Sequence, residues 1–408
     1  MGKTFGLLGE KLNHSLSREI HAMLGDDNYQ LFEVPSKQLN LFMSSGNFDG
    51  INVTIPYKRT VMPMLSKTSE LSRRVGCVNT VLRRQDNGRL YGYNTDVYGF
   101  SYMIDSAGVN VAGKKCLIIG DGGAAASVRA SLEDHGAGEI INVTRSKYAA
   151  IPKLFPDAQI LVNATPVGMF PENGKAPTTV GGMNRLEAVC DLIYNPLKSA
   201  LLLDAEENGI KAVNGLSMLV AQAKRARELF TGSQIDDSVI PQIVSAIEEK
   251  TRNIIIIGMP GSGKTTVGKA LAERLGMHHI DIDEAIIKLY GRSPERIIRR
   301  EGENAFRRTE HVAAEWAGKQ TSSVVSAGGG IVLRADNKNA LRQNGIVIMI
   351  NRDVTSLETC GRPISQNRSI EEIYNERMPL YREWCDLEVD NNGTVEETVD
   401  TIVKLIGR

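Results

Sequence analysis

The sequence contains a group of residues whose types and spacing suit phosphate binding. They lie between an apolar run that begins at Ile254 and the helical stretch "TTVGKALAERLG". Glycines in such a loop let backbone N–H groups surround phosphate oxygens, while a lysine meets the β and γ charges and a threonine hydroxyl can bind magnesium. The pattern predicts a nucleotide site with Mg²⁺, and a glycine-rich turn without nucleotide is the alternative. The loop residues are Gly258, Gly261, Gly263, Lys264, Thr265 and Thr266.

Two aspartates follow the next strand-like run of this half. "HIDIDEAI" places Asp281 and Asp283 at the carboxyl end of a strand, where ligands bind in open α/β sheets. One can lie near Mg²⁺ while the other accepts a hydroxyl proton. The alternative is that Asp283 only caps the following helix. Further downstream come residues that bear on the identity of the acceptor, although isolated arginines are usually surface charges: Arg307, Gly328, Gly329, Gly330 and Arg377.

A second pair of candidate residues lies in the first half of the chain. "GINVTIPYK" reads as a strand and a turn that exposes Lys58, and "GYNTD" ends a predicted hairpin at Asp96. A lysine and a carboxylate at such edges can transfer the proton that hydride transfer to a ketone requires. From spacing alone, a plain salt bridge explains the pair equally well.

A strand, a glycine turn and a helix follow at residues 115–136. The turn contains Gly120, Gly122, Gly123 and Ala124, and it departs from the strict G-x-G-x-x-G pattern of dinucleotide folds. The next strand, "EIINVTRSK", ends in Thr144 and Arg145 where an NAD-selective fold carries an acidic residue. A cation there suits the 2′-phosphate of NADP, and a surface arginine is the alternative.

The elements that must position these residues alternate along the whole chain. Short apolar runs separated by amphipathic stretches predict an α/β fold with parallel sheets covered by helices. One hairpin interrupts the alternation, at the turn signal Asp86-Asn87-Gly88. Because 408 residues exceed one ordinary domain of roughly 100 to 200 residues, several domains are expected, with the main boundary near Lys250.

Composition excludes several classes of partner. Lys plus Arg equals Asp plus Glu at 48 each, so no net charge attracts nucleic acid or an anionic membrane. The five cysteines show neither a disulfide pattern nor zinc-ligand spacing. The start of the chain lacks the apolar region of a signal peptide, and nothing approaches a membrane span. We therefore expect a cytoplasmic protein that binds small molecules. Its oligomeric state stays open.

From the phosphate loop to its end, the chain resembles shikimate kinase. The Asp-x-Asp, F-R-R, triple-glycine and R-x-P-L-Y elements stand in that family's order. The resemblance implies that Asp283 is the base for the attacked hydroxyl and that Asp281 lies near Mg²⁺ beside Thr265. It implies that the shikimate carboxylate is bound by Arg307 and Arg377, beside the triple glycine, and that a lid brings Arg362 onto the transferred phosphate. One departure concerns the region before the lid, where Leu357, Glu358 and Thr359 replace an arginine that lies on adenine.

Residues 1–248 resemble shikimate dehydrogenase through the segments "HSLS", "NVTIPYK", "VNT", "NTD", "NATPVGM", "DLIYNPLKS" and "NGLSMLVAQA". The resemblance implies that Lys58 and Asp96 are the catalytic pair. It also implies a set of residues around the substrate, namely Ser15, Ser17, Thr54, Asn79, Tyr194 and Gln222. NADP(H) would lie on the glycine turn, Thr144 and Arg145, with Met218 near the nicotinamide. Two positions depart from the pattern, Asp121 inside the turn and Arg18 after Ser17.

Together, the two resemblances imply a bifunctional enzyme. It would reduce 3-dehydroshikimate with NADPH and phosphorylate the resulting shikimate with MgATP. The implied domains are residues 1–97 for substrate, completed by the helices of 215–248; a Rossmann-type NADP-binding domain, 98–214; and a P-loop kinase domain, 252–408. Two alternatives are a ligand sensor that keeps both folds, which the presence of the catalytic residues disfavours, and a quinate-using NAD enzyme, which Arg145 disfavours.

Overall fold

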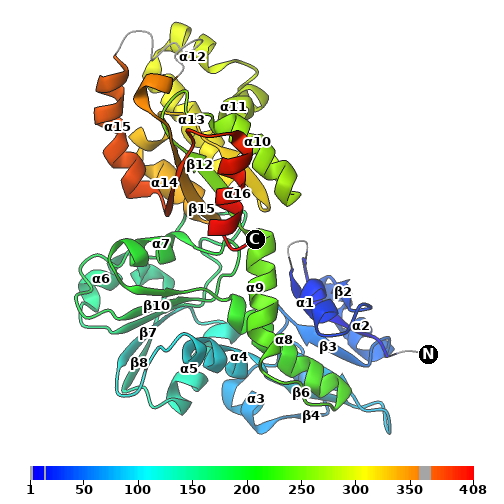
Figure 1. Ribbon diagram of the computed structural model, residues 1–408. Coiled ribbons are helices and arrows are strands. Elements are labelled where there is room, and N and C mark those ends of the chain that lie inside the picture. The colour runs from blue at the N-terminus through cyan, green and yellow to red at the C-terminus, as the bar shows by residue number, and fades with distance from the viewer. Residues whose placement is uncertain (1–2, 13–14, 358–368) are drawn as a thin grey trace. The chain divides into compact units, whose positions relative to one another are not determined.

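The computed structural model describes residues 3–12, 15–357 and 369–408. Contacts divide the chain into two compact units, Met1–Ile247 and Glu248–Arg408, with the division inside helix α9 (Val239–Thr251). In the described ranges the strands form three sheets, two in the first unit and one in the second (Figure 1). Across these ranges no helix is long and apolar enough to cross a membrane. The predicted α/β class is confirmed.

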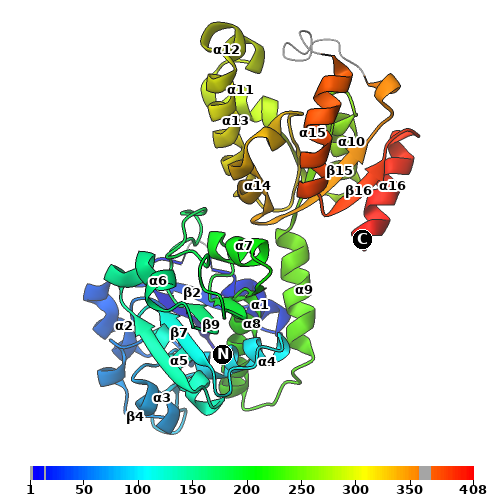
Figure 2. The same cartoon turned by 90° about the vertical axis from the view of Figure 1, so that its left-hand side faces the viewer.

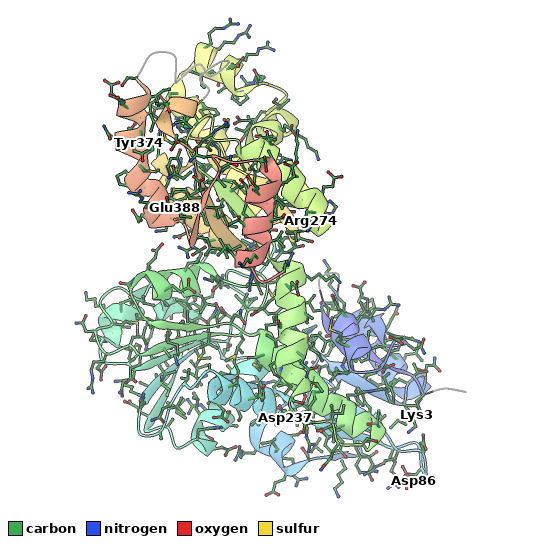
Figure 3. The ribbon with its side chains drawn as sticks, in the orientation of Figure 1. Lys3, Asp86, Asp237, Arg274, Tyr374 and Glu388 are labelled. Carbon is green, nitrogen blue, oxygen red and sulfur yellow. The ribbon has the colours of Figure 1, made fainter. Side chains whose placement is uncertain are left out.

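The first sheet is mixed because a hairpin reverses the chain within it. Its order is β2-β1-β3-β5-β6-β4, with β3, β5 and β6 antiparallel and the other pairs parallel. Asp86 lies in the turn between β5 and β6, as its turn signal predicted (Figure 3). The strands are β1 (Phe5–Gly9), β2 (Gln30–Glu33), β3 (Gly50–Val53), β4 (Lys67–Thr68), β5 (Thr80–Arg83) and β6 (Leu90–Tyr93).

The helices that pack around the first sheet come from both ends of the first unit. Helix α8 belongs here although it follows the second sheet in sequence, because Phe230 packs on Phe5 of β1 with ring centroids 4.8 Å apart. The linker from α8 to α9 contains Asp237 (Figure 3). The helices are α1 (Ser17–Met23), α2 (Leu39–Ser45), α3 (Glu70–Val75) and α8 (Leu216–Thr231), with short 3₁₀ turns η1 (Ser36–Gln38) and η2 (Met62–Met64).

The second sheet is parallel and has the order β11-β10-β9-β7-β8. The order reverses between β7 and β9, and such a switch point opens a crevice at the carboxyl ends of the strands, where ligands bind. The glycine turn follows β7 at this crevice. The strands are β7 (Lys115–Ile119), β8 (Glu139–Val143), β9 (Ile160–Asn163), β10 (Ala188–Asp191) and β11 (Lys211–Val213).

Helices cover both faces of the second sheet (Figure 1). Phe100 and Met103 of α4 and Val128 of α5 pack on one face, whereas Ile151 of α6 and Leu201 of α7 pack on the other. Strands buried on both faces explain the continuous apolar runs of the sequence. The elements are α4 (Asp96–Ser106), α5 (Gly123–Asp134), η3 (Arg145–Ala150), α6 (Ile151–Leu154) and α7 (Ala200–Glu207).

The second unit contains a parallel sheet of order β13-β14-β12-β15-β16. The central strand β12 carries the phosphate-loop pattern at its carboxyl end, between β14 and β15. Its isoleucines are completely or almost completely buried, as the apolar run predicted. The strands are β12 (Asn253–Ile257), β13 (His278–Asp281), β14 (Ser323–Ser326), β15 (Gly345–Asn351) and β16 (Leu387–Asp390).

Two helical layers enclose this sheet. Val267 of α10 and Ile402 of α16 pack on one face, and Ala313 of α13 and Tyr381 of α15 on the other. Helices α11, α12 and α13 stand side by side (Figure 2). The helices are α10 (Lys264–Leu275), α11 (Ile282–Tyr290), α12 (Pro294–Glu301), α13 (Glu303–Gly318), α14 (Ala335–Arg342), α15 (Ile370–Trp384) and α16 (Val395–Leu405), with η4 (Ile331–Leu333) and η5 (Val354–Ser356).

Candidate active sites

The first site centres on an ion pair between Lys58 and Asp96. Lys58 Nζ donates to Asp96 Oδ2 at 2.6 Å. Asp96 is the first residue of α4, where the positive end of the helix dipole favours a carboxylate. The lysine side chain is 18% exposed and the aspartate 6%, so the pair is largely desolvated but its cation still reaches the surface. Such a lysine can give a proton to an oxygen placed beside it.

An amide network fixes the aspartate of this pair. Asn79 Nδ2 donates to Asp96 Oδ1 at 2.8 Å and lies 3.0 Å from Thr95 Oγ1. The backbone N–H of Thr95 donates to Asn79 Oδ1 at 2.7 Å, which sets the amide orientation. Gln222 Oε1 lies 3.5 Å from Asn79 Nδ2, so α8 reaches the same point. The structure thus brings together Lys58, Asn79, Asp96 and Gln222.

The remaining substrate candidates lie on elements of the same unit. Ser15 Oγ donates to Ser17 Oγ at 3.0 Å, at the start of α1. The backbone N–H of Thr54 donates to Leu8 O at 2.9 Å, directly after β3. Tyr194 packs among apolar residues that include Ile20 of α1, and burial raises the pKa of its hydroxyl. Arg18 lies inside α1 and is exposed, so the departure there leaves the helix intact.

The glycine turn comes directly against the ion pair. Gly120 has φ +118°, a conformation that L side chains rarely adopt, and a Cβ there would lie 3.2 Å from Ala164 O. Gly123 begins α5, and a Cβ on it would lie 3.5 Å from Lys58 Cδ. The turn therefore leaves backbone N–H groups of a helix start beside Lys58, which fits a dinucleotide pyrophosphate. Gly122 and Ala124 complete the turn.

Thr144 and Arg145 lie exposed at the carboxyl end of β8. Thr144 precedes η3 and Arg145 begins it. Burial and the Asp121 carboxylate raise the pKa of Tyr148, whereas Arg145 lowers it, so both charges act on one tyrosine. Asp121 is exposed, and its backbone carbonyl accepts from Arg59 Nη2 at 3.2 Å. A cation at this strand end fits a 2′-phosphate.

Met218 lies on α8 beside α4. It is 7% exposed, and a Cβ at Gly99 of α4 would lie 2.7 Å from the Met218 carbonyl oxygen. The close approach of these helices is possible because position 99 is a glycine. Met218 thus belongs to the second sheet's core.

The phosphate loop of the second unit has the backbone its motif requires. Gly258, Gly261 and Gly263 have φ values of +149°, +88° and +89°. Lys264 Nζ donates to the carbonyls of Gly258 at 3.0 Å and Met259 at 2.9 Å, so its ammonium group lies across the loop. Thr265 and Thr266 follow in the exposed first turn of α10. The loop fits nucleotide phosphates.

Thr265 and Asp281 form the predicted metal position. Thr265 Oγ1 donates to Asp281 Oδ2 at 2.8 Å. Mg²⁺ commonly binds one or two protein oxygens and completes its shell with water and phosphate, so this pair fits. Among the described residues no larger His, Cys, Asp and Glu cluster offers a metal site. The structure also corrects one alternative: Asp281, not Asp283, caps α11, since its Oδ1 accepts from the N–H groups of Asp283 at 2.9 Å and Glu284 at 3.4 Å.

The side chain of Asp283 faces the first residue of the triple glycine, as does that of Glu310. A Cβ at Gly328 would lie 3.7 Å from Asp283 Oδ1 and 2.9 Å from Glu310 Oε1. A Cβ at Gly330 would collide with the Arg307 guanidinium. Burial lowers the pKa of Arg307, but the Glu310 and Glu303 carboxylates together outweigh this effect, so the pKa lies above its ordinary value. The triple glycine thus leaves room for the groups that face it.

Arg377 joins this cluster from α15. Its Nη1 donates to Gly329 O at 3.0 Å, and the hydroxyl of Tyr381 donates to the same oxygen. The buried Nε atoms of Arg307 and Arg377 find no hydrogen-bond acceptor within the ranges the structure describes. Two arginines whose Nε donors are unused, beside the triple glycine, fit an anionic acceptor.

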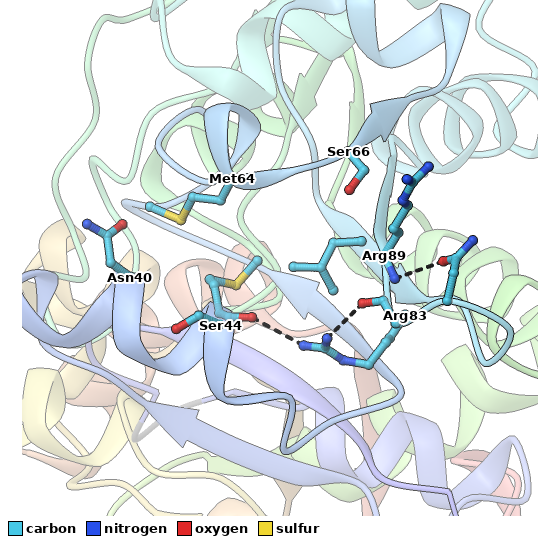
Figure 4. A pocket seen from close by; sticks show the side chains of 10 residues that line it. Asn40, Ser44, Met64, Ser66, Arg83 and Arg89 are labelled. Carbon is cyan, nitrogen blue, oxygen red and sulfur yellow. Dashed lines mark hydrogen bonds between the residues drawn. The ribbon is translucent and has the colours of Figure 1, made fainter.

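Some predicted features fall elsewhere. Arg362, Glu358 and Thr359 lie outside the described residues, whereas Leu357 is buried in the core of the second unit. A pocket of about 440 Å³ beside the β5–β6 hairpin contains none of the predicted residues (Figure 4). Arg83 spans its wall and donates to the carbonyls of Gly88 and Met43, which is a structural role.

Sequence reasoning missed several residues of the sites. Glu310 stands three positions after Arg307 on α13, and that i, i+3 spacing was a usable signal. Asn391 Nδ2 donates to Ser262 O at 2.6 Å and braces the phosphate loop from the end of β16. No pattern in the sequence joins positions 129 apart. The sequence offered no signal for Thr95 or Arg59 either. Their roles depend on contacts with residues distant in sequence, Asn79 for Thr95 and Asp121 for Arg59.

Comparisons with known proteins cover both units. A family model described as shikimate kinase matches residues 260–407, and one described as the shikimate dehydrogenase substrate binding domain matches residues 7–81. A shikimate dehydrogenase (NADP(+)) of Clostridium perfringens is 38% identical over 270 residues, which are 60% of this chain and 98% of the relative. The corresponding protein of Clostridium beijerinckii is 35% identical over 269 residues, again 60% and 98%.

Solved structures similar to the chain agree with these relatives. A chorismate mutase/shikimate 5-dehydrogenase fusion protein from Clostridium acetobutylicum is 35% identical with a TM-score of 0.57, and the match covers 61% of this chain and 99% of that one. A shikimate 5-dehydrogenase from Thermus thermophilus, in complex with NADP(H) and shikimate, is 30% identical with a TM-score of 0.54, over 60% and 99%. Both resemblances found in the sequence are confirmed.

Proposed function

The chain belongs to the shikimate dehydrogenase family through its first unit and carries a shikimate kinase domain in its second, and we propose that the residues gathered at the two sites perform the two reactions. It is a bifunctional enzyme of the shikimate pathway. The first unit reduces 3-dehydroshikimate to shikimate with NADPH. The second converts shikimate to shikimate 3-phosphate with MgATP.

One observation carries the assignment of the first site: the Lys58–Asp96 pair lies directly against the glycine turn. Lys58 Nζ is 2.6 Å from Asp96 Oδ2, and the Gly123 position lies beside the Lys58 side chain. Reduction of a ketone by a nicotinamide cofactor needs a proton donor close to the bound dinucleotide, and this arrangement offers both. NADPH supplies a hydride when it is bound. Lys58 gives the carbonyl oxygen its proton, and Asp96 stabilises the lysine cation and orients it.

We assign the binding of the dehydrogenase substrate to polar residues around this pair. Asn79 and Gln222 lie within hydrogen-bond reach of each other and face the same point as Asp96. Ser15 and Ser17 offer hydroxyl donors to the substrate carboxylate at the start of α1. Thr54 and Tyr194 complete the set, and Met218 is placed beside the nicotinamide. Thr144 and Arg145 bind the 2′-phosphate, which favours NADP(H) over NAD(H).

In the kinase site Asp283 accepts the proton of the shikimate hydroxyl as its oxygen bonds to the γ-phosphorus and the bond to the ADP oxygen breaks. Lys264 and the loop N–H groups stabilise the phosphate charge, and Mg²⁺ is held by Thr265 and Asp281. Arg307 and Arg377 bind the shikimate carboxylate beside the triple glycine. For Arg362, which lies outside the described residues, we propose a contact with the transferred phosphate on the basis of the family motif alone.

We assign residues 1–97 and 215–248 to the dehydrogenase substrate, residues 98–214 to NADP(H) and residues 252–408 to the kinase reaction. The sheets support this division, since strands β1–β6, β7–β11 and β12–β16 each form one sheet. We also propose a cytoplasmic location. Free thiols at Cys77, Cys116, Cys190 and Cys385 suit a reducing compartment.

A coupled assay on the full-length protein tests the proposal. The unaltered chain should convert 3-dehydroshikimate, NADPH and MgATP into shikimate 3-phosphate. Lys58→Ala should lower reduction by far more than about tenfold, which corresponds to about 1.4 kcal/mol of barrier, and should leave phosphorylation of added shikimate unchanged. Asp283→Asn should do the reverse, because its amide cannot take the hydroxyl proton. Failure of the unaltered chain to carry out either reaction would overturn the assignment of that unit.

A further inference from the structure

A continuous line of hydrogen bonds leads from the proposed catalytic pair to Tyr29, the residue directly before β2. The Tyr29 hydroxyl donates to Asn52 Oδ1 at 2.7 Å, and Asn52 Nδ2 donates to Thr80 Oγ1 at 3.1 Å. Thr80 Oγ1 donates to Asn79 Oδ1 at 3.2 Å, and Asn79 Nδ2 donates to Asp96 Oδ1 at 2.8 Å. We call these four bonds the relay. It reaches Lys58 through Asp96.

The direction of the relay follows from groups whose hydrogen-bonding role is obligatory. The backbone N–H of Thr95 can only donate, and it points to Asn79 Oδ1, so Nδ2 of Asn79 must face Asp96. The carbonyl of Asn79 can only accept, and Asn52 Nδ2 lies 3.5 Å from it, so Oδ1 of Asn52 must face Tyr29. An amide oxygen cannot donate; the Tyr29 hydroxyl therefore must. Thr80 Oγ1 accepts from Asn52 Nδ2 and lies 3.2 Å from Asn79 Oδ1, which can only accept, and 3.4 Å from Thr95 Oγ1. The donors of the four bonds therefore point toward Asp96.

The relay is closed to water along its length. Its members are almost completely buried: Tyr29 is 1% exposed, Asn52 4%, Thr80 0% and Asn79 2%. Asn52 of β3 and Thr80 of β5 are cross-strand partners, so the sheet itself holds them together. In a low-dielectric interior, aligned hydrogen bonds strengthen one another, and removal of one leaves a buried group unsatisfied.

Tyr29 also makes a contact through its ring. Its ring stacks on His21 of α1, with centroids 3.8 Å apart and planes 4° apart. Burial and the nearby Arg227 lower the pKa of His21 to about 3, so the imidazole is neutral at working pH. Burial also raises the pKa of the Tyr29 hydroxyl, which keeps it a donor.

We propose that Tyr29 is a positioning residue of the dehydrogenase reaction, acting through Asn52, Thr80 and Asn79 to hold the Asp96 carboxylate where it orients Lys58. The inference rests on the proposed function of the first unit. Tyr29 touches neither substrate nor cofactor in this role. Its loss should reduce the rate of the chemical step, because Asp96 and Lys58 would sample orientations unsuited to proton transfer, and should leave NADPH binding intact.

Tyr29→Phe is the first test, since it removes the hydroxyl and keeps the stacked ring. We expect kcat for 3-dehydroshikimate reduction to fall about fivefold to tenfold while KM for NADPH changes less than about twofold. Tyr57→Phe is the matched control. Tyr57 is also 1% exposed and donates a buried hydrogen bond, but to Val34 O in a core cluster without Tyr29. Tyr57→Phe should lower thermal stability and keep kcat within about twofold of the unaltered chain.

A double-mutant cycle separates the relay from independent structural damage. Thr80→Val breaks the relay between Tyr29 and Asp96 and keeps a β-branched residue in β5. If the four bonds act as one unit, kcat of the double variant Tyr29→Phe/Thr80→Val should be no lower than kcat of Thr80→Val alone. Multiplied effects of the two changes would overturn the proposal, as would a Tyr29→Phe enzyme with normal kcat. Equal rate losses in Tyr57→Phe and Tyr29→Phe would overturn it too. If the unaltered chain had no reductase activity, the proposed function of the first unit would fail, and the proposal for Tyr29 would fail with it.

Discussion

Glu310 Oε2 lies 2.7 Å from Arg307 Nη1, and its side chain is 1% exposed. On the other side, Glu303 Oε1 lies 3.0 Å from Arg307 Nη2 with a side chain that is 49% exposed. One helix, α13, thus places a buried and an exposed carboxylate on the same arginine. Burial raises the pKa of Glu310, although Arg307 and Arg377 act in the opposite direction. The buried carboxylate is thus shielded from solvent where it contacts the guanidinium that lies against Gly330.

Glu310→Gln should therefore weaken the binding of shikimate. Without the carboxylate, the Arg307 guanidinium loses its buried counter-charge and the contact that orients it. We therefore expect KM for shikimate to rise about tenfold while KM for ATP stays unchanged. Glu303→Gln is the control, because an exposed ion pair contributes little, and its KM should stay within about twofold. Steady-state kinase kinetics measure both. Equal effects of the two variants would contradict a special role for the buried carboxylate.

Arg145→Asp should move the cofactor preference of the reductase from NADPH toward NADH. The new carboxylate repels the 2′-phosphate and can accept from a free 2′-hydroxyl. Lys147→Asp makes the same change of charge two residues later in η3 and should shift the preference much less. The ratio of kcat/KM for the two cofactors is the measurement. An unchanged ratio in Arg145→Asp would leave the NADP contact to other residues.

Thr265→Val should raise the Mg²⁺ concentration that half-saturates the kinase. The variant keeps the shape of the side chain and loses the hydroxyl that lies 2.8 Å from Asp281 Oδ2. Thr265→Ser restores a hydroxyl at the same position and should return the Mg²⁺ requirement to within about threefold of the unaltered chain. Phosphorylation assayed over a Mg²⁺ titration tests this. Rescue by serine distinguishes metal binding from a packing effect, since serine lacks the methyl group.

Asp191 should make the first unit less stable as pH rises. Burial raises its pKa to about 7, against hydrogen bonds from Ser199, Ile193 and Asn163 that lower it. Because the folded pKa lies above the usual value of 3.8, the folded chain binds the proton more tightly. This stabilisation is fully present below pH 3.8 and is lost as pH rises through about 7. The slope is at most about 1.4 kcal/mol per pH unit.

The comparison with Asp191→Asn measures this contribution. The amide cannot titrate, so the stability difference between the two proteins should change between pH 4 and 7 and level off above about pH 7. Thermal unfolding of the full chain can follow it, with the transition of the first unit identified by its shift on addition of NADPH. A stability difference that stays constant over this range would show that Asp191 is ionised throughout.

Local patterns predicted the parts of the sites that form within one strand, turn and helix. The phosphate loop lies where its glycines and Lys264 indicated, because such a loop needs only the strand before it and the helix after it. The hairpin at Asp86 was predictable in the same way, because a turn depends only on its own residues and the two strands that flank it. The alternative in which Asp283 only caps the following helix was wrong, because Asp281 is the cap. A cap depends on where the helix begins, and helix ends are the least certain part of a sequence interpretation.

By itself the sequence determined the α/β class and both families, and it predicted Lys58, Asp96, Lys264 and Asp283 as catalytic residues, because short motifs and their order carry this information. Only the tertiary structure decided which groups surround them. Asn79 meets Gln222 across 143 positions, and Tyr29, which precedes β2, reaches Asp96 through residues of β3 and β5 and through Asn79. Such contacts arise when strands distant in sequence pair and exclude water. The strength and direction of a buried hydrogen bond depend on that exclusion, which no local pattern encodes.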